Sequence, residues 1–114
     1  MPLDKLIETL EGLHPEVYEQ GSMAADAAYP ERFYTFWNTS SDDHKHYDNT
    51  TYGYTWAVEV NAYAKHPDVV TSMLEQARIA LQAAGWKING KGHSVASDDP
   101  NYSGRGFTAV YLET

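Results

Sequence analysis

The stretch YGYTWAVEVNAY, residues 52–63, decides the fold class, because its side chains alternate with a period of two. Tyrosine, tryptophan, valine and alanine occupy every second position from Tyr52 to Ala62, and Glu59 and Asn61 are among the residues between them. Successive side chains of a β-strand point to opposite faces of a sheet. The alternation therefore predicts a long strand with one buried face.

A helix is predicted directly after this strand. Pro67 stands at the first helical position, and Asp68 lies in the first turn, where the helix dipole favours an anion. The apolar stripe that follows consists of Val70, Leu74, Ala77, Leu81 and Ala84. Gly85 provides the left-handed position that commonly ends a helix, and Trp86 the apolar residue that folds back on the last turn. We expect the apolar stripe to pack on the sheet.

Three shorter elements are predicted on the N-terminal side. The apolar residues of segment 3–10 share one face at helical spacing, which predicts a short helix. A brief strand is expected at 17–20, and an aromatic-rich strand at 32–37. The polar stretch 38–51 contains almost nothing apolar, so we expect a long exposed loop there.

A hairpin and a strand are predicted on the C-terminal side. Asn89-Gly90 is a strong tight-turn signal, which predicts a hairpin between segment 86–88 and the run beginning near His93. Segment 107–112 is the last predicted strand.

The order of these elements predicts an α+β fold, with two main helices packed on one face of a mostly antiparallel sheet. The chain has 114 residues and contains no linker, internal repeat or low-complexity segment. We therefore expect a single domain over residues 1–114.

The charge balance argues against nucleic-acid binding. Sixteen acidic residues against eight basic ones give a formal charge of −8, and the basic residues are spread along the chain. Nucleic-acid binding relies on clustered Lys and Arg that neutralise phosphates. The chain contains no cysteine, which excludes thiol chemistry and disulfides. No stretch is apolar enough for a membrane span, and the N-terminal residues lack the features of a signal peptide, so we expect synthesis in the cytoplasm.

The candidate metal ligands lie in the polar stretch. His44, His46 and Asp48, with Asp42 and Asp43 before them, are residue types that ligate divalent ions, and a His-X-His pair can bring both rings together. A solvated loop accounts for the same composition without a metal. We therefore expect neither a bound metal nor a cofactor.

No active site is expected, so the chain is predicted not to be an enzyme. Asp98 and Asp99 are adjacent carboxylates, but neighbouring strand residues diverge and Asp99-Pro100 is typical of a turn. Arg105 stands between two glycines, where it either marks the turn before the last strand or reaches a partner's carboxylate. The nine tyrosines and three tryptophans exceed the needs of one small core, which favours a role in subunit contacts.

The motifs together resemble the tail terminator and tail completion family of long-tailed bacteriophages, also described as minor tail proteins. The resemblance covers roughly residues 32–114. The motifs that carry it are Tyr54-Thr55-Trp56, Val58-Glu59-Val60-Asn61, His66-Pro67-Asp68, Gly85-Trp86, Gly90-Lys91-Gly92, Ser97-Asp98-Asp99-Pro100 and Gly104-Arg105-Gly106.

The resemblance implies a structural protein of the virion tail, assembled in the cytoplasm of the host bacterium. Such proteins form rings, commonly hexameric, at the head-proximal end of the tail tube. The implied partners are further copies of the chain, the tail tube protein and the head–tail connector proteins, with DNA passing through the ring. The candidate interface residues are Asp42, Asp43, Tyr54, Trp56, Asp98, Asp99 and Arg105.

We further expect the stretch 38–51 to reach toward the lumen or the tube, with the acidity of the chain preventing passing DNA from adhering. The alternative hypothesis is a small cytoplasmic binding module that holds a metal or polar ligand through the His/Asp-rich loop.

Overall fold

Strand β5 (Tyr54–Ala64), the long strand that the alternation predicted, lies at the centre of the sheet in the computed structural model. It pairs antiparallel with β2 (Arg32–Asp43) on one side and with β8 (Ser103–Glu113) on the other. The structure describes residues 2–19, 31–43, 46–47, 50–51, 54–88, 90, 92–95 and 101–113. Three strands of eleven or twelve residues therefore form the main part of the sheet.

Short strands flank these three. Strand β1 (Val17–Glu19) runs parallel to β2, while β6 (Lys87–Ile88) and β7 (His93–Val95) both pair antiparallel with the outer side of β8. A separate antiparallel pair is formed by β3 (His46–Tyr47) and β4 (Thr50–Thr51). The sheet order is β1-β2-β5-β8-β6, with β7 also on β8.

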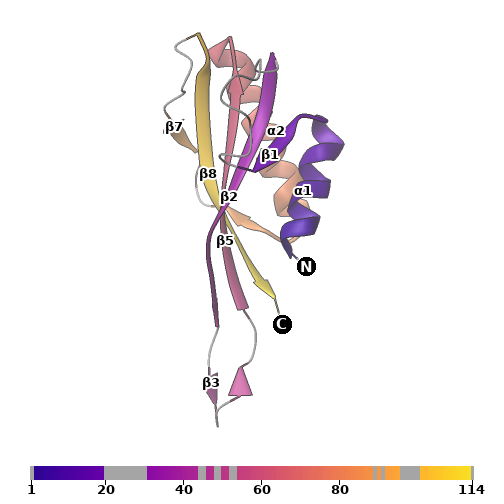
Figure 1. Ribbon diagram of the computed structural model, residues 1–114, viewed down its shortest axis with the longest axis vertical. Coiled ribbons are helices and arrows are strands. Elements are labelled where there is room, and N and C mark those ends of the chain that lie inside the picture. Colours follow the sequence, from indigo (N-terminus) through magenta and orange to yellow (C-terminus); the bar gives the residue numbers. More distant parts are fainter. Residues whose placement is uncertain are drawn as a thin grey trace.

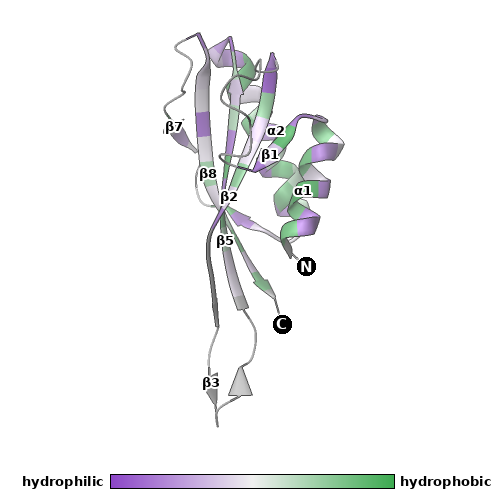
Figure 2. Ribbon diagram, in the orientation of Figure 1, coloured by the Kyte–Doolittle hydropathy of each residue, from purple (hydrophilic) through white to green (hydrophobic). Residues whose placement is uncertain are grey.

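Both helices pack on the same face of the sheet, where they cover its upper part (Figure 1). They are α1 (Pro2–Leu13) and α2 (Pro67–Ala83). Figure 2 shows the hydrophobic residues of α1 toward the sheet and hydrophilic residues on its outer side. The largest fully buried side chains of the core are Tyr34, Phe107, Leu6, Leu10, Leu81, Val58, Val60 and Val70. The α+β prediction is thus confirmed, including the single helix-covered face.

The C-terminus of α2 has the predicted glycine cap. Gly85 adopts a left-handed φ of 102°, and its amide donates to the carbonyl of Gln82. The amide of Trp86 donates to the carbonyl of Leu81 at 3.0 Å. These two bonds form a Schellman motif, which satisfies carbonyls that the helix end leaves free. Trp86 is 2% exposed, so the cap also turns this indole into the core.

The prediction of a loop over 38–51 is wrong for all of its described residues, which belong to β2, β3 and β4. Strand β2 continues to Asp43 and pairs with β5 as far as Tyr54. A register shift between Asn38 and Ser40 marks a bulge within the pairing. Polar residues continue a strand here because the neighbouring strand supplies backbone hydrogen bonds, which do not depend on side-chain polarity.

The predicted hairpin around Asn89-Gly90 is also wrong. Strands β6 and β7 do not pair with each other, since both lie along β8 as two pieces of one interrupted edge strand. Lys87 pairs with Val110, whereas His93 pairs with Gly106, so the register shifts by two residues across the interruption. Gly90 and Gly92 have φ values of 76° and 91°, which allow the chain to leave the edge and return to it.

Candidate functional site

A three-stranded extension of the sheet, here called the arm, projects beyond the helices (Figure 1). It consists of Ser40–Asp43 of β2, Tyr54–Ala57 of β5 and Val110–Glu113 of β8. The molecule is correspondingly elongated, with extents of 53 × 28 × 23 Å. The last fully buried residues on β5 and β8 before the arm are Val58 and Ala109. Among the arm residues of β5 and β8 whose burial the structure describes, none is fully buried, so strand pairing connects these segments to the rest of the sheet.

An aromatic contact between described residues anchors the arm to the core. Trp56 and Tyr111 are half-buried register partners that pack against the core cluster. The rings of Tyr111 and Trp86 lie 5.2 Å apart. The base of the arm is thereby fixed relative to the end of α2.

Both outer edges of the arm are open among the described residues. Strand β1 covers β2 only as far as Phe36, and β6 covers β8 only at Ala109 and Val110. No described residue pairs with the outer side of β2 at 40–43 or of β8 at 111–113. An open edge presents unpaired N–H and C=O groups, which can template pairing with another strand. Because both strands are antiparallel to β5, β2 and β8 run in the same direction.

The structure brings four of the predicted interface residues together in the arm. Asp42 and Asp43 on β2 pair with Thr55 and Tyr54 on β5, next to Trp56. The remaining predicted residues lie elsewhere or outside the described part of the chain. His44, Asp48, Asp98 and Asp99 lie outside it, and His46 belongs to β3 opposite Thr51.

Arg105 does not lie in a turn, so that interpretation of Gly104-Arg105-Gly106 is wrong. It belongs to β8, where it pairs with Ala62 and Ser94. Its Nη2 donates to the carbonyl oxygen of Gly92 at 3.1 Å, at the end of the interruption that precedes β7. The half-buried guanidinium therefore helps to hold this interruption in place.

The face of the sheet away from the helices, here called the far face, contains a cluster that sequence reasoning missed. The imidazole Nε2 of His93 lies 3.8 Å from Oε1 of Glu59, although β8 separates their strands. Asn61 on β5 is 6% exposed, and its Oδ1 has no hydrogen-bond partner. The alternation placed Glu59 and Asn61 on one face of their strand. The position of His93 depends on the register of β7, which no local sequence pattern indicates.

The far face is not uniformly exposed, which corrects the expectation of one buried face for β5. Near its upper end, the rings of Phe33 and Tyr63 stack with centroids 5.1 Å apart, and Tyr102 lies 6.1 Å from Phe33. Lower down, Trp37 is 55% exposed and Leu112 47% exposed. The far face therefore combines a buried aromatic end with an exposed apolar end.

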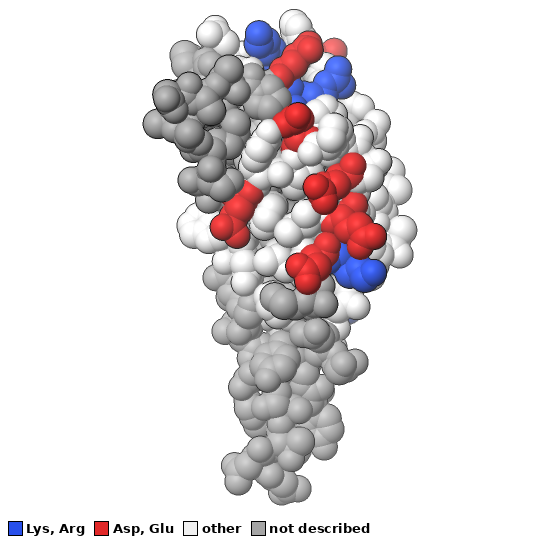
Figure 3. Space-filling model, turned by 45° about the vertical axis from the view of Figure 1, so that its right-hand side comes forward, with Lys and Arg blue, Asp and Glu red and all other residues white. Residues whose placement is uncertain are grey.

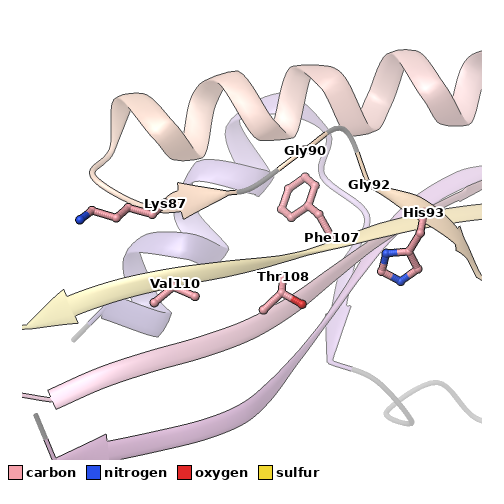
Figure 4. Close-up of a pocket in the computed structure, with 7 residues that line it drawn as sticks. All are labelled: Lys87, Gly90, Gly92, His93, Phe107, Thr108 and Val110. Atoms are coloured by element: carbon pink, nitrogen blue, oxygen red, sulfur yellow. The ribbon is translucent and has the colours of Figure 1, made fainter.

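A pocket of about 560 Å³ opens where the edge strand is interrupted (Figure 4). Its lining consists of Lys87, Gly90, Gly92, His93, Phe107, Thr108 and Val110. The ionisable side chains of Lys87 and His93 come from opposite ends of the interruption, and the Lys87 chain extends away from the others (Figure 4). Within the described residues, no three His, Cys, Asp or Glu side chains form a metal-binding group.

None of the helices in the described part of the chain is long and apolar enough to cross a membrane. Comparison with known proteins finds no family model that matches this chain and no matching curated protein.

Proposed function

We propose that this chain is a structural protein of bacteriophage tail assembly, which forms a ring at the head-proximal end of the tail tube, ends tube growth and joins the tail to the head. The observation that carries the proposal is the three-stranded arm, whose two outer edges are open among the described residues. A subunit with two different open edges is suited to head-to-tail assembly, in which unlike surfaces of neighbouring copies meet.

The directions of the strands define how such a contact forms. Strands β2 and β8 run the same way, so the β8 edge of one copy meets the β2 edge of the next as a parallel pair. A two-fold contact between identical edges would instead pair the strands antiparallel and stop at a dimer. Repeated parallel pairing continues the sheet from copy to copy until the ring closes.

Six arms would contribute about 18 strands, a size at which closed barrels enclose an aqueous channel. The hexamer comes from the family resemblance, and the three strands per copy from the pairing of β2, β5 and β8. The charge of −8 would discourage DNA from adhering during passage.

The motifs of the resemblance occupy positions that shape this subunit. Tyr54-Thr55-Trp56 forms the β5 part of the arm, and His66-Pro67-Asp68 begins α2. Gly85-Trp86 caps α2, and Gly104-Arg105-Gly106 lies where β7 joins β8. These placements support the proposal because the four motifs lie in or next to the helix and the strands that carry the arm.

The first experiment measures the mass of the purified protein by light scattering over a wide concentration range, with negative-stain imaging of the same samples. Rings of about six chains with an open centre are expected, either alone or after addition of tail tubes. A protein that stays monomeric even with tubes present would contradict the proposal.

Cysteine crosslinking tests the proposed contact directly, since the chain has no cysteine of its own. Asp42 and Leu112 share register with Thr55, so an Asp42→Cys/Leu112→Cys variant should form a ladder of disulfide-linked oligomers on oxidation. Either single variant should stop at dimers. A control pair, Ser72→Cys/Leu112→Cys, replaces the β2 position by an exposed site on α2 and should give no ladder. A ladder from the control alone would place the contact elsewhere.

A further inference from the structure

Three strands converge on one small polar cluster on the far face. Asn61 of β5, Gly106 of β8 and His93 of β7 are consecutive register partners across the sheet. Glu59 lies two residues before Asn61 on the same strand, and therefore on the same face. Because Gly106 has no side chain, the imidazole can reach across β8 to within 3.8 Å of the Glu59 carboxylate.

The amide of Asn61 points into the space that Gly106 leaves free. A Cβ atom on Gly106 would lie 1.9 Å from Oδ1 of Asn61 and 3.0 Å from its Cγ, so the oxygen is the atom nearest to that space. Asn61 is 6% exposed, and Oδ1 has no hydrogen-bond partner. Buried polar atoms are normally satisfied, so this acceptor and the equally unpaired hydroxyl of Thr35, the register partner of Asn61 on β2, leave room for a bound partner at this point of the far face.

We propose that His93, Glu59 and Asn61 form a binding site for a divalent first-row transition-metal ion such as Zn²⁺. The neutral imidazole, the carboxylate and the amide oxygen all offer lone pairs, and the cluster contains no cationic side chain to accept them. Metal–ligand bonds of about 2.0–2.2 Å allow donors 3.8 Å apart to share one ion. Three protein ligands leave a coordination position for water, and the pocket beside His93 and Thr108 provides room for it.

The two ends of the site differ in exposure, which favours an ion entering from solvent. The His93 side chain is 60% exposed and that of Glu59 27% exposed, whereas Asn61 is buried. The nitrogen and oxygen donors suit Zn²⁺, Mn²⁺, Co²⁺ or Ni²⁺. This site is separate from the His44, His46 and Asp48 candidates, and it does not depend on ring assembly.

Calorimetry of the full chain with zinc chloride tests the site, with imidazole NMR signals as a second readout. We expect one Zn²⁺ per chain, with the His93 ring resonances shifting on addition. His93→Gln should weaken Zn²⁺ binding by roughly tenfold or more. Because the His93 side chain is exposed, the substitution should leave the fold intact, so a loss of binding would not reflect misfolding. The matched control, His44→Gln/His46→Gln, removes two imidazoles from the polar stretch and should leave the affinity unchanged.

Asn61→Asp separates a metal ligand from a merely structural amide. A carboxylate at this position should tighten Zn²⁺ binding roughly tenfold by adding ligand charge. Without metal it should destabilise the fold, because it buries an unpaired charge. Should Asn61→Asp fail to fold, the His93→Gln comparison decides the question alone.

Two results would overturn the proposal. The first is the absence of Zn²⁺, Mn²⁺, Co²⁺ and Ni²⁺ binding up to millimolar concentration, which would leave an ordered water as the partner of Asn61. The second is binding that survives in His93→Gln but is lost in His44→Gln/His46→Gln, which would place the metal in the polar stretch.

Discussion

The hydroxyl of Tyr34 on β2 donates a hydrogen bond to the main-chain carbonyl of Met73 on α2, at 2.7 Å. Both residues are buried, so this bond ties the sheet to the helix layer inside the core. Burial raises the pKa of Tyr34 to about 12 from its ordinary value of 10.0. The native state therefore favours the protonated phenol, and it loses this stabilisation in strongly alkaline solution.

Replacing Tyr34 by phenylalanine should lower the free energy of unfolding by about 1 kcal/mol at pH 7, because one buried hydrogen bond is lost. The native state binds the phenol proton more tightly than the unfolded chain does. The stability that results is fully present below pH 10 and is lost as pH rises toward 12. The phenylalanine variant has no proton to lose at this position. The difference in the free energy of unfolding between wild type and variant should therefore shrink between pH 10 and 12. Urea denaturation at pH 7, 9 and 11 measures the difference, and a deficit independent of pH would contradict the assignment.

Gly106→Ala should destabilise the protein by roughly 2 kcal/mol or more, because the new methyl group overlaps Oδ1 of Asn61 and meets the Val60 carbonyl at 3.0 Å. The double variant Gly106→Ala/Asn61→Ala should recover part of this loss. Gly12→Ala is the matched control, since nothing lies within 4 Å of that position in α1. It should stabilise the helix by up to about 1 kcal/mol. If the two substitutions change the free energy of unfolding additively, residues 106 and 61 are not in contact.

Gly85→Ala should cost about 1 kcal/mol, since the φ of 102° at the cap of α2 is unfavourable for a residue with a Cβ. The added methyl group would also approach Cε2 of Tyr111 at 3.2 Å, next to the contact that anchors the arm. Gly85→Asn should cost less, because asparagine tolerates left-handed conformations better. Thermal unfolding should place the three proteins in the order Gly, Asn, Ala. The reverse order of the two variants would argue against the backbone explanation.

Neutralising the carboxylates at the β2 end of the arm should strengthen ring assembly. Asp42, Asp43 and Glu113 lie in the strand segments that the proposed contact brings together, and like charges on neighbouring strands repel. Asp42→Asn/Asp43→Asn should therefore assemble at lower protein concentration than the wild type in dilute buffer. The advantage should fade as salt screens the charges. Light scattering across ionic strengths measures both effects.

The control for this experiment removes the same charge from a distant surface. Glu8 and Glu11 are exposed on α1, where acidic side chains gather (Figure 3). Glu8→Gln/Glu11→Gln changes the net charge equally without touching the arm. Equal effects from both variants would indicate a general charge effect and would count against the arm contact.

The sequence predicted the elements that local patterns specify. The alternation of residues 52–63 placed β5, and Pro67 with Gly85 marked the limits of α2. Both signals depend on residues close together in the chain. The apolar periodicity of these two elements also predicted the single helix-covered face, because each has one stripe to bury.

Features that depend on pairing between distant segments were missed. The polar composition of residues 38–43 predicted a loop, but these residues form a strand because β5 provides a pairing partner. Asn89-Gly90 predicted a hairpin turn. The local sequence does not show that β6 and β7 both pair with β8 instead of with each other. The His93–Glu59 pair depends on the same register. Of the predicted interface residues, those in the arm came together because they follow one another along β2 and β5.

The shared direction of β2 and β8 has a consequence for any ring closed through them. Since every copy is added by the same rotation, all arms would project from one rim and the helix layers would surround the other. The two rims would then differ in shape and chemistry, so each could recognise a different neighbour. A ring of this kind is polar along its axis. One rim could end the growth of one structure, while the other rim offers an unrelated surface to a second structure.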